Sequence, residues 1–239
     1  METYENTILK WIGYVLFLVV IAVHVFNIGG SNAESLAGQR IVTFGTYEQD
    51  NKADNGPEAI EWIVLEEKDG KALLLSRYGL DSIPFHSSDE DAAWEKSSLR
   101  SWLNIDFMHN AFTPDEQAAI QVTTVQNGAD QGNTMSIGSA NTQDQVFLLS
   151  YAEAYKMYFR SNEARMCAPT DYAVARNAWA DVGSMTDGRP SGSWWLRSSA
   201  DSLMNALIVD FDGGELFCNI HFDNHIVRPA IWVDLAAVH

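Results

Sequence analysis

The stretch from Asp201 to His225 carries the side chains best suited to binding another molecule. It mixes aromatic, apolar and acidic residues with two histidines around an Asp-Gly-Gly turn at residues 212–214. This mixture favours a protruding patch over a sheet interior, where apolar side chains would alternate toward one face. The candidate ligand-binding residues are Asp201, Leu203, Met204, Asn205, Asp210, Phe217, Asn219, His221, Phe222, Asp223 and His225.

Phe217 and Phe222 are the expected anchors of this patch, because binding energy concentrates in a few aromatic contacts. The acidic residues would tune specificity, and His221 and His225 would add a dependence on pH. The alternative is that the two phenylalanines cover the core from the edge of a sheet.

Familiar catalytic motifs are missing from the sequence, which has no Gly-rich phosphate loop, HExxH, GxSxG or CxxC. The spacing of four histidines specifies neither a metal site nor a triad: His86, His109, His221 and His225. The carboxylates at positions 210, 212 and 215 could suggest calcium, but hairpin turn chemistry explains the Asp-Gly-Gly sequence better. We therefore assign no catalytic residue, no metal and no cofactor.

The composition limits the classes of partner and of fold. With 32 acidic and 15 basic residues in 239, the net charge is -17, so the field around the chain repels phosphate backbones and nucleic-acid binding is not expected. Cys167 and Cys218 are too few for a disulfide-built fold and lack the paired spacing of a zinc site. An apolar content of 46% is enough for a packed globular domain.

Residues 11–28 (WIGYVLFLVVIAVHVFNI) form an uncharged apolar run, and 18 helical residues at about 1.5 Å each span roughly 27 Å, close to a bilayer core. Small residues at Ser31 and Ala33 also match a signal-peptidase site. Residues 1–30 are therefore either a transmembrane anchor or a signal peptide, and both export the rest. Residues 31–39 read as a linker, and residues 40–239 as one domain.

Strand-like runs at residues 40–44, 61–65 and 71–76 begin this domain, and the Asp69-Gly70 pair favours a tight hairpin between the last two. Two helices follow, the second starting at Thr113 with Pro114 in its first turn. Residues 127–141 and 183–192 are expected loops. Ser150 should cap a helix through Phe159, and Thr170 another through about residue 179. Strands at 194–197, 206–211, 215–220 and 230–235 close the chain.

The tryptophans and two arginines of these elements have a structural interpretation. Trp62, Trp102, Trp195 and Trp232 are expected to be mainly scaffold, and of the adjacent Trp194 and Trp195 at least one should be core. Arg197 and Arg228 lie in apolar strands, where a guanidinium needs carboxylate or carbonyl partners. Both are expected to tie the scaffold together.

Six ordered motifs resemble an uncharacterised bacterial domain family over about residues 40–236: VTFGTY (42–47), EWIVL (61–65), LRSWLN (99–104), LLSYAEA (148–154), WWLRS (194–198) and VRPA (227–230). The closing strands are similar to the C-type-lectin fold of formylglycine-generating enzymes and of the variable proteins of diversity-generating retroelements. The resemblance implies an α+β, C-type-lectin-like domain with a mixed or antiparallel sheet and flanking helices, preceded by one hydrophobic helix. Formylglycine-generating enzymes use closely spaced cysteines, whereas Cys167 and Cys218 are 51 positions apart (218 minus 167), which disfavours that activity.

Residues 217–226 (FCNIHFDNHI) favour the retroelement alternative, because all ten residues are of types that codons ending in a pyrimidine encode, and diversified segments retain such codons. The expected function is therefore an exported, cell-surface or secreted protein that binds a protein or carbohydrate ligand, on a diversified C-terminal surface or, alternatively, on a fixed one. An enzyme of the formylglycine-generating type is the third interpretation.

Residues 11–28 should place the domain outside the cytoplasm, because their length and lack of charge suit export. A reporter that is active only in the cytoplasm, fused after His239, should give little signal, and deleting residues 11–28 should restore it. Strong signal from the intact fusion would contradict the predicted topology.

Overall fold

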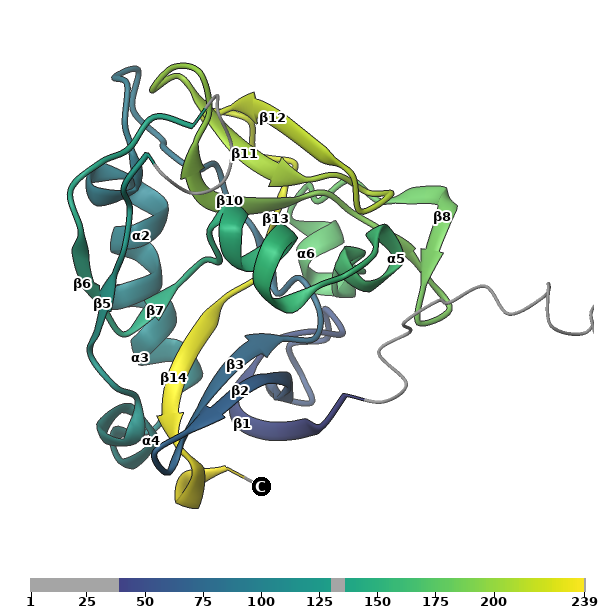
Figure 1. Cartoon of the computed structure of the whole chain (residues 1–239). Coiled ribbons are helices and arrows are strands. Elements are labelled where there is room, and N and C mark those ends of the chain that lie inside the picture. Colours follow the sequence, from purple (N-terminus) through teal and green to yellow (C-terminus); the bar gives the residue numbers. More distant parts are fainter. Residues whose placement is uncertain (1–38, 130–135, 239) are drawn as a thin grey trace, which may run out of the picture. The chain divides into compact units, whose positions relative to one another are not determined.

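The computed structural model describes residues 39–129 and 136–238 and contains two five-stranded sheets with short helices around them (Figure 1). The predicted mixed α+β class is thus confirmed. The hydrophobic segment 11–28 and nearly all of the predicted linker lie outside the described residues. Within the described ranges, no helix is long and apolar enough to cross a membrane.

The first sheet is antiparallel and brings the two ends of the domain together. Its strand order is β1 (Ile41–Tyr47), β2 (Glu58–Lys68), β3 (Lys71–Ser76), β14 (Ala230–Asp234) and β7 (Val146–Phe147). Asp69 and Gly70 form the predicted turn between β2 and β3, with φ of 52° and 76°. These positive φ values suit a two-residue hairpin turn, which explains the Asp-Gly pair.

The second sheet carries the C-terminal half and is mixed. Its order is β12 (Glu215–Asn219), β11 (Asn205–Val209), β10 (Trp194–Ser199), β13 (Ile226–Val227) and β4 (Asp81–Ser82), with β10 and β13 parallel. The predicted turn joins β11 to β12, and Gly213 there has a φ of 79°. A Cβ on Gly213 would lie 1.9 Å from the Asn162 carbonyl oxygen, so no other residue fits.

Two small hairpins complete the strands, β5 (Thr123–Val125) with β6 (Thr142–Asp144), and β8 (Asp181–Thr186) with β9 (Arg189–Ser191). The expected loop at 183–192 is therefore wrong, because Asp187 and Gly188, with φ of 52° and 74°, form a hairpin turn there. The described residues of the other expected loop, 127–141, contain no helix or strand.

The helices are short: α2 (Ser98–Trp102), α3 (Met108–Ala111), α4 (Pro114–Ala119), α5 (Asn162–Arg165) and α6 (Asp171–Ala175). The structure also has two π-helical turns, η3 (Leu103–Phe107), which joins α2 to α3, and η4 (Glu153–Tyr158). Two 3₁₀ turns are η2 (Trp94–Lys96), before α2, and η5 (Leu235–Ala237), after β14. The predicted start of α4 is confirmed, since Thr113 and Glu116 form a capping box around Pro114.

Strand β10 is buried along its whole length. Trp194 and Trp195 point to opposite faces, and their indole N–H groups donate to the carbonyl oxygens of Arg165 and Ile83, both at 3.0 Å. Trp62 is also fully buried, as predicted. Trp102 and Trp232 are only partly buried against the core.

Arg197 of β10 connects separate segments of the fold, as predicted. Its guanidinium pairs with both carboxylate oxygens of Glu153 and donates to the carbonyl oxygen of Leu148 at 2.8 Å. Arg228 is fully buried and donates to the carbonyl oxygens of Ser76 and Arg165, with its guanidinium carbon 5.0 Å from the Trp194 ring centroid. The Glu153 carboxylate offsets the desolvation of Arg197, whereas the carbonyl oxygens offset only part of it at Arg228, whose Nη2 has no partner among the described residues and whose pKa burial lowers.

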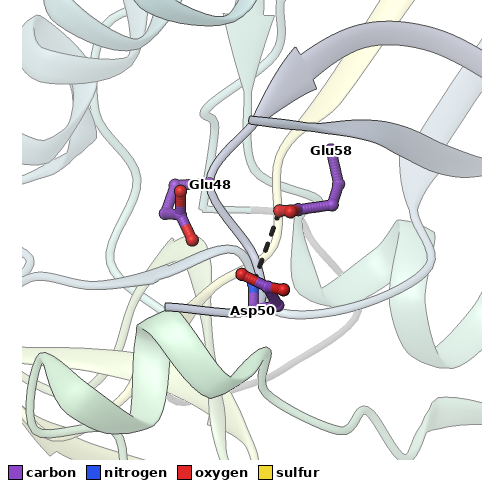
Figure 2. A group of neighbouring side chains, drawn as sticks. All are labelled: Glu48, Asp50 and Glu58. Carbon is purple, nitrogen blue, oxygen red and sulfur yellow. Dashed lines mark hydrogen bonds between the residues drawn. The ribbon is translucent and has the colours of Figure 1, made fainter. Parts of the chain in front are cut away.

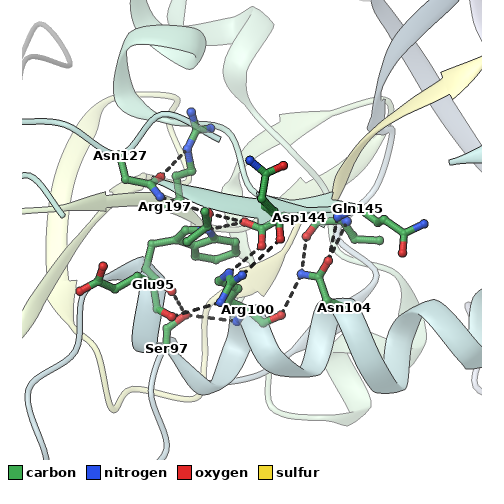
Figure 3. Close-up of polar contacts among 12 residues, drawn as sticks. Glu95, Ser97, Arg100, Asn104, Asn127, Asp144, Gln145 and Arg197 are labelled. Carbon is green, nitrogen blue, oxygen red and sulfur yellow. Dashed lines mark hydrogen bonds and ion pairs between the residues drawn. The ribbon is translucent and has the colours of Figure 1, made fainter. Parts of the chain in front are cut away.

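A second polar network fastens the helical segment that contains LRSWLN to strands β6 and β7 (Figure 3). The buried Asp144 carboxylate accepts from Trp94 Nε1 at 2.9 Å and from Arg100 Nε at 2.6 Å. The Asn104 side chain donates to the Val146 carbonyl oxygen at 2.8 Å and accepts from the Gln145 amide at 2.9 Å. These contacts give the polar residues of the motif a structural role.

Replacing Glu153 by Ala should cost about 3–5 kcal/mol of unfolding free energy, because it leaves the buried Arg197 cation unpaired. Urea unfolding measures this loss, and Glu163→Ala, an exposed acid on α5, is the control with an expected loss below about 1 kcal/mol. Adding Arg197→Met to the Glu153→Ala variant should recover part of the stability. Equal losses of unfolding free energy in Glu153→Ala and in the control Glu163→Ala would contradict the stabilising role of the Glu153–Arg197 ion pair.

Candidate functional site

A hollow of about 410 Å³ lies where the chain leaves α6 and where it returns from β12. Trp179 and Phe222 are 47% and 55% exposed, which is unusual for such large apolar side chains. The lining residues are Val174, Asn177, Ala178, Trp179, Phe222, Asp223 and Asn224.

Two direct contacts join the segments that form the hollow. The Trp179 amide donates to the Asn224 carbonyl oxygen at 3.0 Å, and Asn177 Nδ2 donates to Asp223 Oδ1 at 2.9 Å. Trp179 also packs edge-on against Phe211, with ring centroids 5.3 Å apart. The indole is therefore held in place although nearly half of it is exposed.

The early end of α6 puts Trp179 in this position. Asn177 has a φ of 84°, the left-handed conformation in which helices commonly end and which Asn tolerates better than most residues. The predicted helix through residue 179 is thus too long, since α6 ends at Ala175. Asn177 was the signal that could have placed Trp179 outside the helix.

The segment 221–225 is held from below by β4 and by the core. Ser82 Oγ donates to the carbonyl oxygens of Asp223 at 2.7 Å and His225 at 3.3 Å. The His225 ring lies 4.6 Å from the Trp195 ring, centroid to centroid. His225 is only 8% exposed, so its predicted place on the recognition surface is wrong. Its ring supports the hollow from inside.

The hollow combines apolar walls with a few polar groups, as small-molecule sites do. Asn224 Oδ1 is buried and has no hydrogen-bond partner among the described residues. Because this oxygen has almost no accessible surface, the polar character of the hollow rests on the Asp223 carboxylate and on the other polar atoms of Asn177 and Asn224. The lining residues contain one carboxylate, Asp223, and no histidine, cysteine or lysine, a set that suits binding more than acid-base chemistry.

The other predicted site residues are spread over the second sheet. Asn205 and Asn219 lie opposite each other at the end of β11 and β12, and Asn205 Nδ2 donates to Asp201 Oδ1 at 3.1 Å. Near them Leu203 is half-buried and Met204 is 46% exposed. These residues do not line the hollow.

Three further predicted residues have separate surroundings. Asp210 Oδ1 accepts from Ser193 Oγ at 2.6 Å and from the Phe211 amide at 2.9 Å, so it organises the start of the turn. His221 Nδ1 lies 2.9 Å from the His86 carbonyl oxygen. Phe217 is 41% exposed on the edge strand β12. Of the predicted residues, only Phe222 and Asp223 line the hollow.

Residues 69–235 match the model of a protein family described as a domain of unknown function, DUF6273. The chain belongs to this family. The match agrees with the predicted membership of an uncharacterised domain family, and both walls of the hollow lie within the DUF6273 region. No curated protein and no solved structure matches the chain.

One acidic group of the described residues lies before the DUF6273 region and could supply oxygen ligands to a cation (Figure 2). It consists of Glu48, Asp50 and Glu58. Their carboxylates already accept hydrogen bonds from the Lys52 amide at 2.9 Å, from Lys52 Nζ at 3.0 Å and from the Gln49 amide at 2.8 Å. These contacts organise the loop between β1 and β2.

Both cysteines are free, Cys167 buried and Cys218 half-buried. Burial raises the pKa of each thiol above its usual value. Because the thiolate is the nucleophile, both thiols are poorly suited to cysteine chemistry near neutral pH.

Burial lowers the pKa of His225 from about 6.5 to about 4, because its ring lies in the core under the hollow. The unfolded chain therefore binds a proton between these values that the folded chain does not. The contribution of His225 to the unfolding free energy is therefore fully present above pH 6.5. It is lost as the pH falls toward 4, where the unfolding free energy is lower by roughly 3 kcal/mol.

The measurement is the unfolding free energy between pH 7 and pH 4 for the natural chain and for His225→Phe, which keeps a ring against Trp195. Between pH 7 and pH 4 the unfolding free energy of His225→Phe should fall by roughly 3 kcal/mol less than that of the natural chain. Identical pH dependences would show that His225 does not stay neutral in the fold.

Proposed function

We propose that this DUF6273 domain is a non-catalytic binding module and that the hollow between Trp179 and Asp223 binds a neutral carbohydrate. The observation that carries the proposal is one hollow lined by two exposed aromatic rings and by the amide and carboxylate groups of Asn177, Asp223 and Asn224. We further propose that the domain acts outside the cytoplasm, which rests on the sequence of residues 11–28 alone.

A sugar ring suits such a surface for a physical reason. One face of a pyranose presents C–H groups that pack on an aromatic ring, while its hydroxyls donate and accept around the edge. The exposed indole of Trp179 offers the apolar platform. The Asp223 carboxylate and the polar groups of Asn177 and Asn224, which also line the hollow, are suited to hydrogen bonds with the sugar hydroxyls.

A fixed site is favoured over a diversified one by the burial of three residues within the segment 217–226. Ile220, His225 and Ile226 of this segment are buried, and Ile220 and Ile226 are fully inaccessible. Free variation at these positions would place mismatched side chains in the core, which typically destabilises a fold.

Protein recognition on β12 is the second candidate, because Leu216 and Phe217 are 47% and 41% exposed on an edge strand. This candidate keeps Phe217 as the predicted anchor. If the surface is diversified, the gene for this chain should lie near a reverse transcriptase gene and a near-copy of the DNA that encodes residues 217–226. Cysteine oxidation of the formylglycine-generating type is not proposed, given the burial of Cys167.

The test is a glycan-array screen of the purified chain, followed by calorimetric titration of a bound neutral glycan. Trp179→Ala and Phe222→Ser should each weaken binding about tenfold or more, because each removes an aromatic contact. The unfolding midpoint is measured for each variant at the same time, since Trp179 also packs on Phe211. Phe217→Ser is the matched control, since it removes an exposed ring outside the hollow.

Loss of binding in the Phe217→Ser variant with intact binding in Trp179→Ala would move the site to β12 and contradict the hollow. The absence of any bound neutral glycan would contradict the proposed ligand class.

A further inference from the structure

A second hollow, of about 360 Å³, lies at the other sheet, beside the turn between β2 and β3. Three segments far apart in the sequence form it: the hairpin turn, the stretch after α4, and β14. The lining residues are Lys68, Asp69, Lys71, Gln121, Val122, Thr123 and Trp232.

Lys68 and Lys71 are directly opposite each other across the β2–β3 pair, so their side chains lie on the same face of the sheet. Like charges in this position repel and are destabilising. Neither ammonium group forms an ion pair among the described residues, although Arg40 on the same sheet pairs with Glu67. Asp69 in the turn lines the hollow, and Asp234 lies directly opposite Lys71 in the β14–β3 pair, so both acids offset part of the charge. The residues that line the hollow still include two cations and one acid, in a chain whose net charge is -17, which favours an anionic ligand.

Trp232 supplies an aromatic wall beside these cations. In the β14–β3 pairing it lies opposite Leu73, two positions from Lys71, so it shares their face of the sheet. The Gln121 amide donates to the Trp232 carbonyl oxygen at 2.8 Å and holds the stretch 121–123 against it. The ring is only half-buried.

The indole N–H of Trp232 separates it from the tryptophans of the core. Trp62, Trp94, Trp194 and Trp195 each donate this proton to a protein oxygen, whereas Trp232 has no acceptor for it among the described residues. The Trp232 N–H is also not among the buried polar atoms that lack a partner, so it remains accessible to a ligand or to water.

We propose that this second hollow binds an acidic saccharide, with its carboxylate or sulfate between Lys68 and Lys71 and a sugar ring on Trp232. A bare inorganic anion would leave the indole unused, and a neutral sugar would leave the net positive charge of the lining without a partner. Nucleic acid fits poorly because the net charge of -17 repels a long phosphate chain.

The test is calorimetric titration of the full chain with uronic-acid oligosaccharides, with their uncharged methyl esters and with sulfated oligosaccharides. At least one acidic member should bind, and its uncharged counterpart should bind about tenfold more weakly or not at all. The double variant Lys68→Gln/Lys71→Gln should weaken acidic-ligand binding by about tenfold or more.

The matched control is Lys96→Gln/Lys156→Gln, which changes the net charge equally but alters two exposed lysines outside the hollow. This control should keep binding, and equal weakening by both double variants would overturn the proposal in favour of a general charge effect. A panel in which no acidic saccharide binds would also overturn it. Trp179→Ala should leave acidic-ligand binding unchanged, so the outcome is separable from that of the first hollow.

Discussion

The complete burial of strand β10 is the constraint on which the rest of the domain depends. A strand with WWLRSS as its sequence brings two indoles and a guanidinium into the core, and each must find a partner there. The partners come from several parts of the chain: Glu153 of η4 for Arg197, and the carbonyl oxygens of Arg165 and Ile83 for the two indoles. The need to pair the buried polar groups of β10 therefore determines which segments pack against the second sheet.

The first hollow inherits its shape from this strand. Trp195 packs against His225, and His225 ends the segment that contains Phe222 and Asp223. Ser82 and the Trp179 amide then hold this segment from two sides through its carbonyl oxygens. Because the segment is held through its own carbonyl oxygens, the Phe222 ring stays exposed above these contacts, and this pre-organisation would lower the cost of the proposed binding.

Local patterns predicted much of the fold. The Asp-Gly turn, the capping box at Thr113 and the partners required by Arg197 follow from short-range chemistry, and the structure bears them out. The 183–192 hairpin was missed because its strands are polar and largely exposed, so no apolar alternation marks them. His225 was misplaced because its burial depends on Trp195, which lies 30 positions away (225 minus 195).

The same limit applies to the sites. Phe222 and Asp223 stood out because they belong to an unusual aromatic and acidic stretch, whereas Trp179 and Asn177 are brought to them only by tertiary pairing. The lysine pair and Trp232 are separated by more of the chain still and meet through the register of three strands. Composition can suggest a binding surface, but only the pairing of distant segments shows which side chains lie together.

The most direct measurement of the central claim is a nuclear magnetic resonance titration that follows the tryptophan indole N–H signals while a bound neutral glycan is added. The Trp179 signal should shift saturably with the glycan concentration, since its ring forms a wall of the hollow. The signals of Trp194 and Trp195 should stay in place, because both indoles are buried and hydrogen-bonded. A bound glycan that leaves the Trp179 signal unmoved would contradict the assignment of the hollow as the binding site.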